Sequence, residues 1–434
     1  MRFGTLVLVL AAAAGAEELV AIKVGRVIPV NGPEIRDGVV LVKGGKIETV
    51  GAGIEVPWNA TVIEAPQGVL MPGLIEAHTS EGLDRPNENV PSVPFVSVLD
   101  ALDPVSFYFE DALREGVTTL LVLPGHATMI GGRGLVVKPV GRTVEQMLVK
   151  PEAAIKLSLE PRPGTSRMSH LQRLRRVFQD LQEYLDAVKA GETPPDQPEP
   201  RTEERPPGEP GREEEEKEGG AGGEKKEETH EPGKIDPRRQ ALVDLIEGRL
   251  LAHVWCPKAA DVPAALDLAE RFHFRAVLVL GPEAWRAAEV AARRKTPVIL
   301  DPRLAFWEQD EETGQEDLRV PPAIFSKAGV KYALLSNPNA AGARSLLFQA
   351  ATAVKHGVDR AEALQSVTLR PAEMLGLADR LGSIEKGKDA TMILLTGDPF
   401  DYRSWVDRVF IDGQVVYERS KDTRLQKLMG KEKK

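Results

Sequence analysis

Short apolar runs of strand character alternate with helix-patterned segments through the middle of this 434-residue chain. The segments 260–272 and 283–294 carry apolar residues at helical spacing. Strands that alternate with amphipathic helices predict βα units around a parallel sheet. The glycine-rich stretch 131–134 lacks the Lys and Ser/Thr of a phosphate loop, so we interpret it as a tight turn. We therefore expect a closed α/β barrel, a (β/α)8 TIM-like fold, whose strand runs include 74–77, 117–123, 250–255, 276–280, 297–300 and 332–335.

Strand-rich segments flank this region near both ends of the chain. Residues 20–30 and 38–50 are rich in β-branched side chains, and 390–395 and 406–417 repeat that character, with turns at Gly44-Gly45 and Asp412-Gly413. We expect these segments to form one small β-sandwich domain from 17–70 and 385–420, beside a barrel over 71–384.

The first residues have the pattern of a secretory signal peptide. Arg2 precedes the apolar run 3–14, and small residues lead to an expected cleavage after Ala16, which gives a signal peptide of 1–16. The run is shorter than the roughly 20 apolar residues that span a bilayer. We expect an exported protein, periplasmic or secreted, with no membrane span after cleavage. Cys256, the single cysteine, excludes an internal disulfide, and we interpret it as a buried small hydrophobic residue.

The acidic charge is concentrated in one segment. The formal net charge is −9, and residues 190–234 hold 15 Asp/Glu against 7 Lys/Arg. This segment has no aromatic or branched aliphatic residue, so we expect a disordered acidic insert within the barrel. The remainder is close to neutral, which argues against a nucleic-acid surface. Residues 421–434 form a basic tail.

The stretch Met-Pro-Gly-Leu-Ile-Glu-Ala-His at 71–78 resembles the first barrel strand of the amidohydrolase superfamily, most closely its imidazolonepropionase-related branch. Residues 115–119 resemble the second strand, and 370–376 and 381–390 resemble the closing helix and the return to the β-domain. The resemblance runs from about residue 21 to residue 417, apart from the insert.

The resemblance implies metal-dependent hydrolysis of non-peptide carbon–nitrogen bonds, with zinc or another divalent ion as cofactor. The superfamily's ligands are a His-x-His on strand one, a Lys or Glu midway, His on strands five and six, and an Asp on strand eight that also accepts a proton. Here His78 is kept and Lys156 matches the middle ligand, with Glu160 as its alternative. Other positions are replaced, by Ser80, Trp255, Pro257, Leu280 and Asn337.

Other histidines offer a replacement site. His126 follows the second strand and His253 lies in or near the fifth, so both might join His78 at the barrel mouth. The alternatives are a solvent-facing loop residue for His126 and a hydrogen-bonded core residue for His253. His170 falls on a helix, where we expect it at the surface. Arg167 resembles a pocket-facing residue of the superfamily, suited to an anionic substrate or to a salt bridge within the loop.

Two functions follow. The first is an amidohydrolase-type enzyme with a reduced or relocated metal site. The second is a pseudoenzyme without a cofactor, whose pocket binds a small-molecule ligand or a partner, because Ser, Asn, Leu, Trp and Pro are poor replacements for metal ligands. The expected partners are a small molecule, a second copy of the chain or a catalytic relative.

Overall fold

The computed structural model describes residues 19–192, 235–337 and 345–430. The expected signal peptide, nearly all of the expected acidic insert and the last residues of the basic tail lie outside these ranges. In the described part of the chain, no helix is both long and apolar enough to cross a membrane. The chain divides into two compact units, Met1–Gly73 with Asp379–Lys434, here the terminal unit, and Leu74–Ala378, here the central unit.

The terminal unit is built on a seven-stranded sheet in the order β17-β16-β15-β4-β1-β2-β3. Strands from both chain ends share this sheet, because β4 pairs antiparallel with β15. The predicted turn at Asp412-Gly413 is confirmed, with both residues at positive φ between β16 and β17. The sandwich form of the domain stays a prediction. The strands are β1 Leu19–Val27, β2 Ile35–Lys43, β3 Lys46–Ala52, β4 Thr61–Pro72, β15 Met392–Leu395, β16 Val406–Ile411 and β17 Gln414–Glu418, followed by η3 Arg419–Lys421 and α11 Thr423–Leu428.

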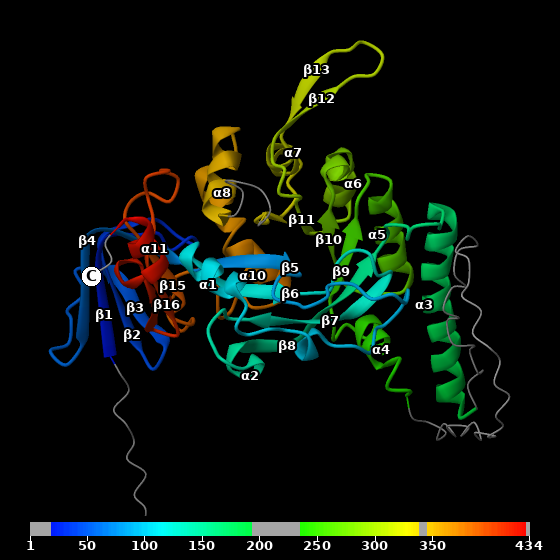
Figure 1. Cartoon of the computed structure of the whole chain (residues 1–434), viewed down its shortest axis with the longest axis horizontal. Coiled ribbons are helices and arrows are strands. Elements are labelled where there is room, and N and C mark those ends of the chain that lie inside the picture. The colour runs from blue at the N-terminus through cyan, green and yellow to red at the C-terminus, as the bar shows by residue number, and fades with distance from the viewer. Residues whose placement is uncertain (1–18, 193–234, 338–344, 431–434) are drawn as a thin grey trace, which may run out of the picture. The chain divides into compact units, whose positions relative to one another are not determined.

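The central unit holds an eight-stranded sheet in the order β14-β11-β10-β9-β8-β7-β6-β5 (Figure 1). The predicted alternation of strands and helices is confirmed, so the fold is mixed α/β. Its strands are β5 Leu74–Thr79, β6 Val117–Val122, β7 Ile130–Val137, β8 Leu148–Ser158, β9 Ala252–Cys256, β10 Ala276–Leu280, β11 Val298–Ile299 and β14 Tyr332–Ala333, with a separate hairpin of β12 Phe306–Gln309 and β13 Glu316–Arg319.

Helices connect most of these strands. They are η1 Val98–Asp100, α1 Phe107–Arg114, α2 Val144–Met147, α3 Arg167–Ala190, α4 Gln240–Ile246, α5 Asp261–Arg271, η2 Pro282–Ala287, α6 Ala288–Arg293, α7 Pro321–Lys327, α8 Leu346–Lys355, α9 Arg360–Gln365 and α10 Leu369–Leu375.

The expectation of a parallel sheet is wrong for β7, which runs antiparallel to β6 and β8. The glycine-rich stretch predicted as a turn lies inside this strand. A Cβ on Gly132 would lie 2.7 Å from the carbonyl oxygen of Val96, and one on Gly134 would lie 2.4 Å from that of Val122. The glycines therefore allow close backbone approach within the sheet rather than a chain reversal.

The two edges of the sheet, β5 and β14, do not pair with each other among the described residues. Ile75 N donates to Val367 O at 2.9 Å, and Leu334 N donates to Ser366 O at 3.1 Å. The segment 366–367 thus bonds to both edges, so strand pairing alone does not close the expected barrel.

We predict that Asp389→Ala lowers the free energy of unfolding by about 2–3 kcal/mol, because its carboxylate is buried and paired with two cations. Its side chain is 2% exposed, and it binds Lys46 and, at 2.9 Å, Arg380. The control is Glu64→Ala, which removes an exposed pair with Lys23 in the same sheet and should change stability by less than about 1 kcal/mol. Urea unfolding followed by circular dichroism measures both, and equal effects would contradict the prediction.

Candidate functional site

Three imidazole side chains from different parts of the central sheet lie together. His78 is the penultimate residue of β5, His253 is in β9, and His126 follows β6. The ring centroids of His78 and His126 are 5.2 Å apart, and those of His78 and His253 are 6.0 Å apart. Three strands separate β5 from β9 in the sheet order. The sheet therefore curves enough to bring side chains of β5 and β9 together on its inner face.

Lys156 and Trp255 extend this cluster. Lys156 in β8 is in register with His253 in β9, and its Nζ lies 5.9 Å from the centroid of the Trp255 ring. The Trp255 ring stacks on His126 with centroids 4.0 Å apart. We call His78, His126, Lys156 and His253 the nitrogen cluster.

The nitrogen cluster is poorly paired, and all of its members are buried except His126, which is half-buried. Lys156 and His253 are 0% exposed, and His78 is 7% exposed. His78 Nδ1, His126 Nδ1, Lys156 Nζ and both ring nitrogens of His253 are buried without a hydrogen-bond partner. Buried polar atoms are nearly always hydrogen-bonded. Five unpaired nitrogen atoms in one place therefore point to a functional role rather than a structural one.

Burial keeps these groups neutral. Burial, followed by the nearby Lys156 charge, lowers the pKa of His126 to about 2 and that of His253 to about 3. The same causes lower the pKa of His78 well below its usual value. Burial lowers the pKa of Lys156 to about 7, against the opposing influence of Cys256 and Glu160. At neutral pH the imidazoles are thus uncharged, and a large fraction of Lys156 is a neutral amine.

A neighbouring loop holds His126 in place. Gly125 N donates to Pro86 O at 2.6 Å, and Ala127 N donates to Asn87 Oδ1 at 2.9 Å. The backbone on both sides of His126 is therefore fixed by the segment after β5. At the rim, Trp255 Nε1 donates to the exposed carboxylate of Glu160 at 2.8 Å.

Glu76 is a site residue that the sequence analysis missed. It lies two residues before His78 in β5, so both side chains point to the same face of the sheet. It is 2% exposed and accepts hydrogen bonds from Ser336 N and Oγ. Burial raises its pKa to about 8, against the lowering effect of the Ser336 hydrogen bonds. An acidic residue between the apolar Ile75 and Ala77 of this buried strand was the available signal.

The other sequence candidates lie as follows. Ser80 comes directly after β5 and is half-buried, and Asn337 follows Ser336 and is also half-buried. Arg167 begins α3, where it forms an ion pair with buried Asp261 and donates to Ala260 O at 2.7 Å. It joins α3 to the start of α5. His170, expected at the surface, is buried, with its Nε2 2.8 Å from Ser158 O.

Comparisons with known proteins agree on one family. The model of the amidohydrolase family matches residues 311–416. An amidohydrolase structure from Thermotoga maritima is 29% identical, with a TM-score of 0.76 over 92% of this chain and 100% of that chain. These findings support the amidohydrolase superfamily as the family of this chain.

Two curated proteins also resemble this chain, and both are named as enzymes of the amidohydrolase type. Amidohydrolase tasK of Hapsidospora irregularis is 25% identical over 412 residues, which is 88% of this chain and 40% of that protein. Imidazolonepropionase of Thermoplasma volcanium is 32% identical over 114 residues, which is 24% of this chain and 27% of that protein. The chain thus spans less than half the length of either curated relative. A prolidase structure, 15% identical with a TM-score of 0.50, shows likeness of fold alone.

The donor chemistry of the nitrogen cluster fits the divalent metal that is usual in amidohydrolases. Metals bind neutral imidazole, and these imidazoles are neutral and each has at least one buried ring nitrogen without a hydrogen-bond partner. In the described ranges, however, no three His, Cys, Asp or Glu side chains are placed as a metal-holding group. The rings of His78 and His126 are stacked, with planes 17° apart. The residues fit the ion by their chemistry, while the stacked arrangement itself does not enclose one.

We predict that Lys156→Met stabilises the chelator-treated protein by about 2–4 kcal/mol at pH 7, because it removes a buried amine with no partner. The pKa of Lys156 is 10.5 when unperturbed and about 7 in the fold. The unfolded chain binds more protons between these values, so the stability of the wild type rises with pH across that range. The gain from Lys156→Met should therefore be greatest at or below pH 7 and shrink towards pH 10.

Urea unfolding at a series of pH values measures this difference. Glu76 titrates in both proteins, so its effect cancels in the comparison. The control is Lys258→Met at an exposed position, which should change stability by less than about 0.5 kcal/mol at every pH. A difference for Lys156→Met that does not vary with pH would contradict the prediction.

Proposed function

We propose that this chain is an amidohydrolase-type hydrolase that cleaves non-peptide carbon–nitrogen bonds of small molecules at the nitrogen cluster. The observation that supports this is the set of buried, unpartnered nitrogens that His78, His126, Lys156 and His253 bring together. Folding alone disfavours such a set, because each unpaired polar atom loses its contact with water. A bound group between these side chains gives the nitrogens their missing partners.

The proposed cofactor is a divalent metal such as zinc. His78, His126 and His253 would hold it, with Lys156 beside them. When bound, such an ion supplies Lewis acidity, which polarises a carbonyl and makes water nucleophilic near neutral pH. The three imidazoles need lose no proton to take this role, because burial already keeps them neutral.

Glu160 is the proposed proton acceptor. The superfamily's acidic acceptor is replaced by Asn337, whose amide has no useful basicity. Glu160 is a carboxylate at the rim, oriented by Trp255 Nε1, and Trp255 in turn stacks on His126. The Trp255 ring therefore contacts both the Glu160 carboxylate and the His126 imidazole.

The proposal also covers the fold around the site and the location of the reaction. We infer a TIM-like barrel that is completed through residues 366–367, which bond to both sheet edges. The signal-peptide pattern at 1–16 supports export as the setting of the reaction.

A second candidate is a pseudoenzyme that binds a ligand or partner without catalysis. Two observations favour it: Ser80, Leu280 and Asn337 stand where the superfamily has ligands, and the described residues contain no ready metal-holding group. In this case the nitrogen cluster would bind the polar groups of a small molecule instead of an ion.

We predict that the protein purified without chelator carries about one divalent ion per chain and hydrolyses at least one amide, lactam or imidazolone. His78→Ala and His253→Ala should each lower metal affinity and kcat/KM by about a hundredfold or more, because each removes a proposed donor. Elemental analysis and a substrate panel measure the two effects. The control is His273→Asn, at an exposed position with φ of 59°, where Asn is well tolerated.

The outcomes separate the two functions. Metal and turnover that both depend on His78 and His253 support the metal-dependent hydrolase. Turnover that persists in chelator and in both variants would rule out the proposed cofactor. Absence of metal together with absence of turnover across the panel favours the pseudoenzyme.

A further inference from the structure

A cavity of about 500 Å³ lies in the central unit, away from the nitrogen cluster. Its wall is formed by the first part of β8, the residues before β9, η1, and parts of β7 and α4. Lys150 of this wall and Lys156 of the nitrogen cluster are separated by roughly 20 Å along β8. The volume falls within the range of about 300–1,000 Å³ that is usual for small-molecule sites. We call this space the β8 cavity.

One part of the wall is apolar. Leu135 of β7 and Leu250 before β9 are 1% and 2% exposed, and Pro151 of β8 lies in the same wall. Leu99 of η1 also lines the cavity and is 36% exposed. A ligand with an apolar body would cover the Leu99 side chain, which favours binding through the hydrophobic effect.

The carboxylates of the wall already have cationic partners. Glu152 of β8 forms an ion pair with Arg133 of β7. Asp244 of α4 accepts a hydrogen bond from Arg249 Nε at 2.8 Å. In the described part of the chain, no carboxylate that lines the cavity is without a cation. The wall is therefore poorly suited to a cationic ligand.

Two cations at the β8 cavity lack a carboxylate partner. The half-buried Lys150 donates from Nζ to Leu375 O at 2.9 Å. Arg275 donates from Nη2 to Gly248 O at 3.0 Å, next to the wall residue Arg249. Among the residues that the structure describes, neither Lys150 nor Arg275 forms an ion pair. Burial, followed by the nearby Arg275 charge, lowers the pKa of Lys150, so the two cations act on each other.

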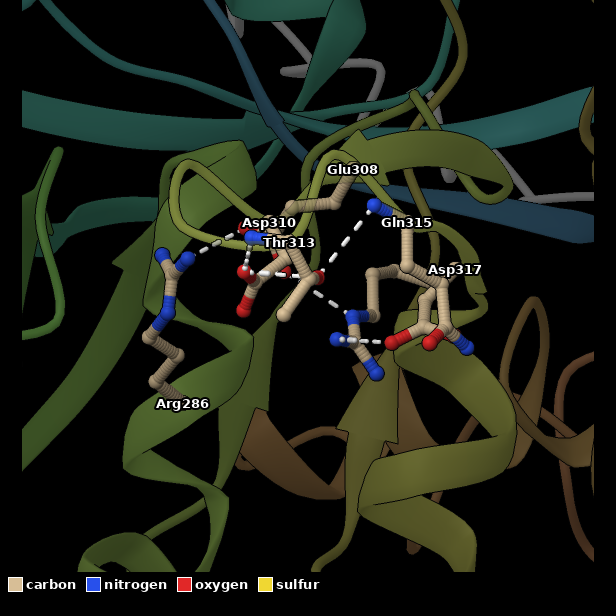
Figure 2. A network of polar contacts seen from close by, with 7 residues as sticks. Arg286, Glu308, Asp310, Thr313, Gln315 and Asp317 are labelled. Carbon is tan, nitrogen blue, oxygen red and sulfur yellow. Dashed lines mark hydrogen bonds and ion pairs between the residues drawn. The ribbon is translucent and has the colours of Figure 1, made fainter.

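A charged network elsewhere in the central unit shows the contrasting case. At the hairpin of β12 and β13, Glu308 forms ion pairs with Arg286 and, at 2.9 Å, with Arg319 (Figure 2). Cations and carboxylates satisfy one another there, as is normal for charges that are partly removed from water. Lys150 and Arg275 lack this balance, so an anion from outside the chain would supply the missing charge.

We propose that the β8 cavity binds a small organic anion, a carboxylate with an apolar body. Its charged group lies toward Lys150, and its body lies against Leu99, Leu135 and Leu250. The positive charge gives selectivity for an anion, while the apolar contact gives most of the affinity. The cavity is separate from the nitrogen cluster, so this inference does not depend on the reaction proposed there.

The test is isothermal titration calorimetry of the full chain, as purified, with octanoate as the probe. Octanoate should bind with a Kd below about 1 mM. Octylammonium has the same apolar body with the opposite charge, and acetate has the same charge with almost no body. Each of these two should bind at least about tenfold more weakly than octanoate, because each lacks one of the two contacts.

Four variants place the binding in this cavity. Lys150→Met should weaken octanoate binding by about tenfold or more, whereas Lys258→Met, the same change at an exposed position, should leave the Kd unchanged. Leu99→Asp sets a like charge beside the ligand and should weaken binding by at least about tenfold. Leu99→Met keeps the apolar contact and should stay within about threefold of the wild type. Thermal unfolding checks that each variant is folded.

The proposal is overturned if octanoate does not bind at concentrations up to about 10 mM. Equal affinities for octanoate and octylammonium, or for octanoate and acetate, would overturn it as well. So would an octanoate affinity that Lys150→Met and Lys258→Met change equally, or one that Leu99→Asp leaves unchanged. The Leu99 pair decides the question by itself where Lys150→Met fails to fold.

Discussion

Desolvation of the nitrogen cluster is the constraint on which the functional argument depends. Imidazole and amine groups lie in the interior of the curved sheet with five nitrogen atoms unpaired. Burial lowers the pKa of Lys156 to about 7 and keeps the imidazoles neutral, which avoids several unpaired buried charges. Stability is sacrificed locally, as is common at sites where a protein binds or reacts.

Much of the fold could be predicted from the sequence, because the evidence for it is local. The alternation of apolar runs with amphipathic helices indicates mixed α/β structure, and Asp412-Gly413 specifies its hairpin turn through positive φ. The antiparallel course of β7 could not be predicted in this way. Its glycines are typical of a turn by composition, yet they serve close approach to Val96 and Val122. Only the tertiary neighbours decide between these two uses.

The histidines and Lys156 of the site could be named from the sequence, whereas Glu76 and the arrangement of all these residues could not. His78 and Lys156 follow from the resemblance, whereas His126 and His253 entered as an alternative alongside simpler structural roles. Their proximity depends on sheet curvature that brings β9 to within reach of β5 across three intervening strands, and no sequence spacing encodes it. For Arg167 the sequence offered two roles, a pocket-facing residue or a salt bridge within its loop. The structure pairs it instead with Asp261, which lies 94 positions away in the sequence, so this partner could not be predicted.

The position of His253 sets the depth of the nitrogen cluster within the sheet. His253 and Trp255 are two residues apart in β9, so they point to the same face at depths that differ by roughly 7 Å. The resemblance drawn from the sequence implies a His at the position of Trp255, and in this structure the Trp255 ring stacks on His126. If that implication holds, the imidazole of β9 lies one layer deeper here, in register with Lys156. A deeper site is drier, which strengthens electrostatic interactions inside it. It also admits less of a substrate, so the proposed reaction is restricted to small molecules or to narrow groups that can pass Trp255.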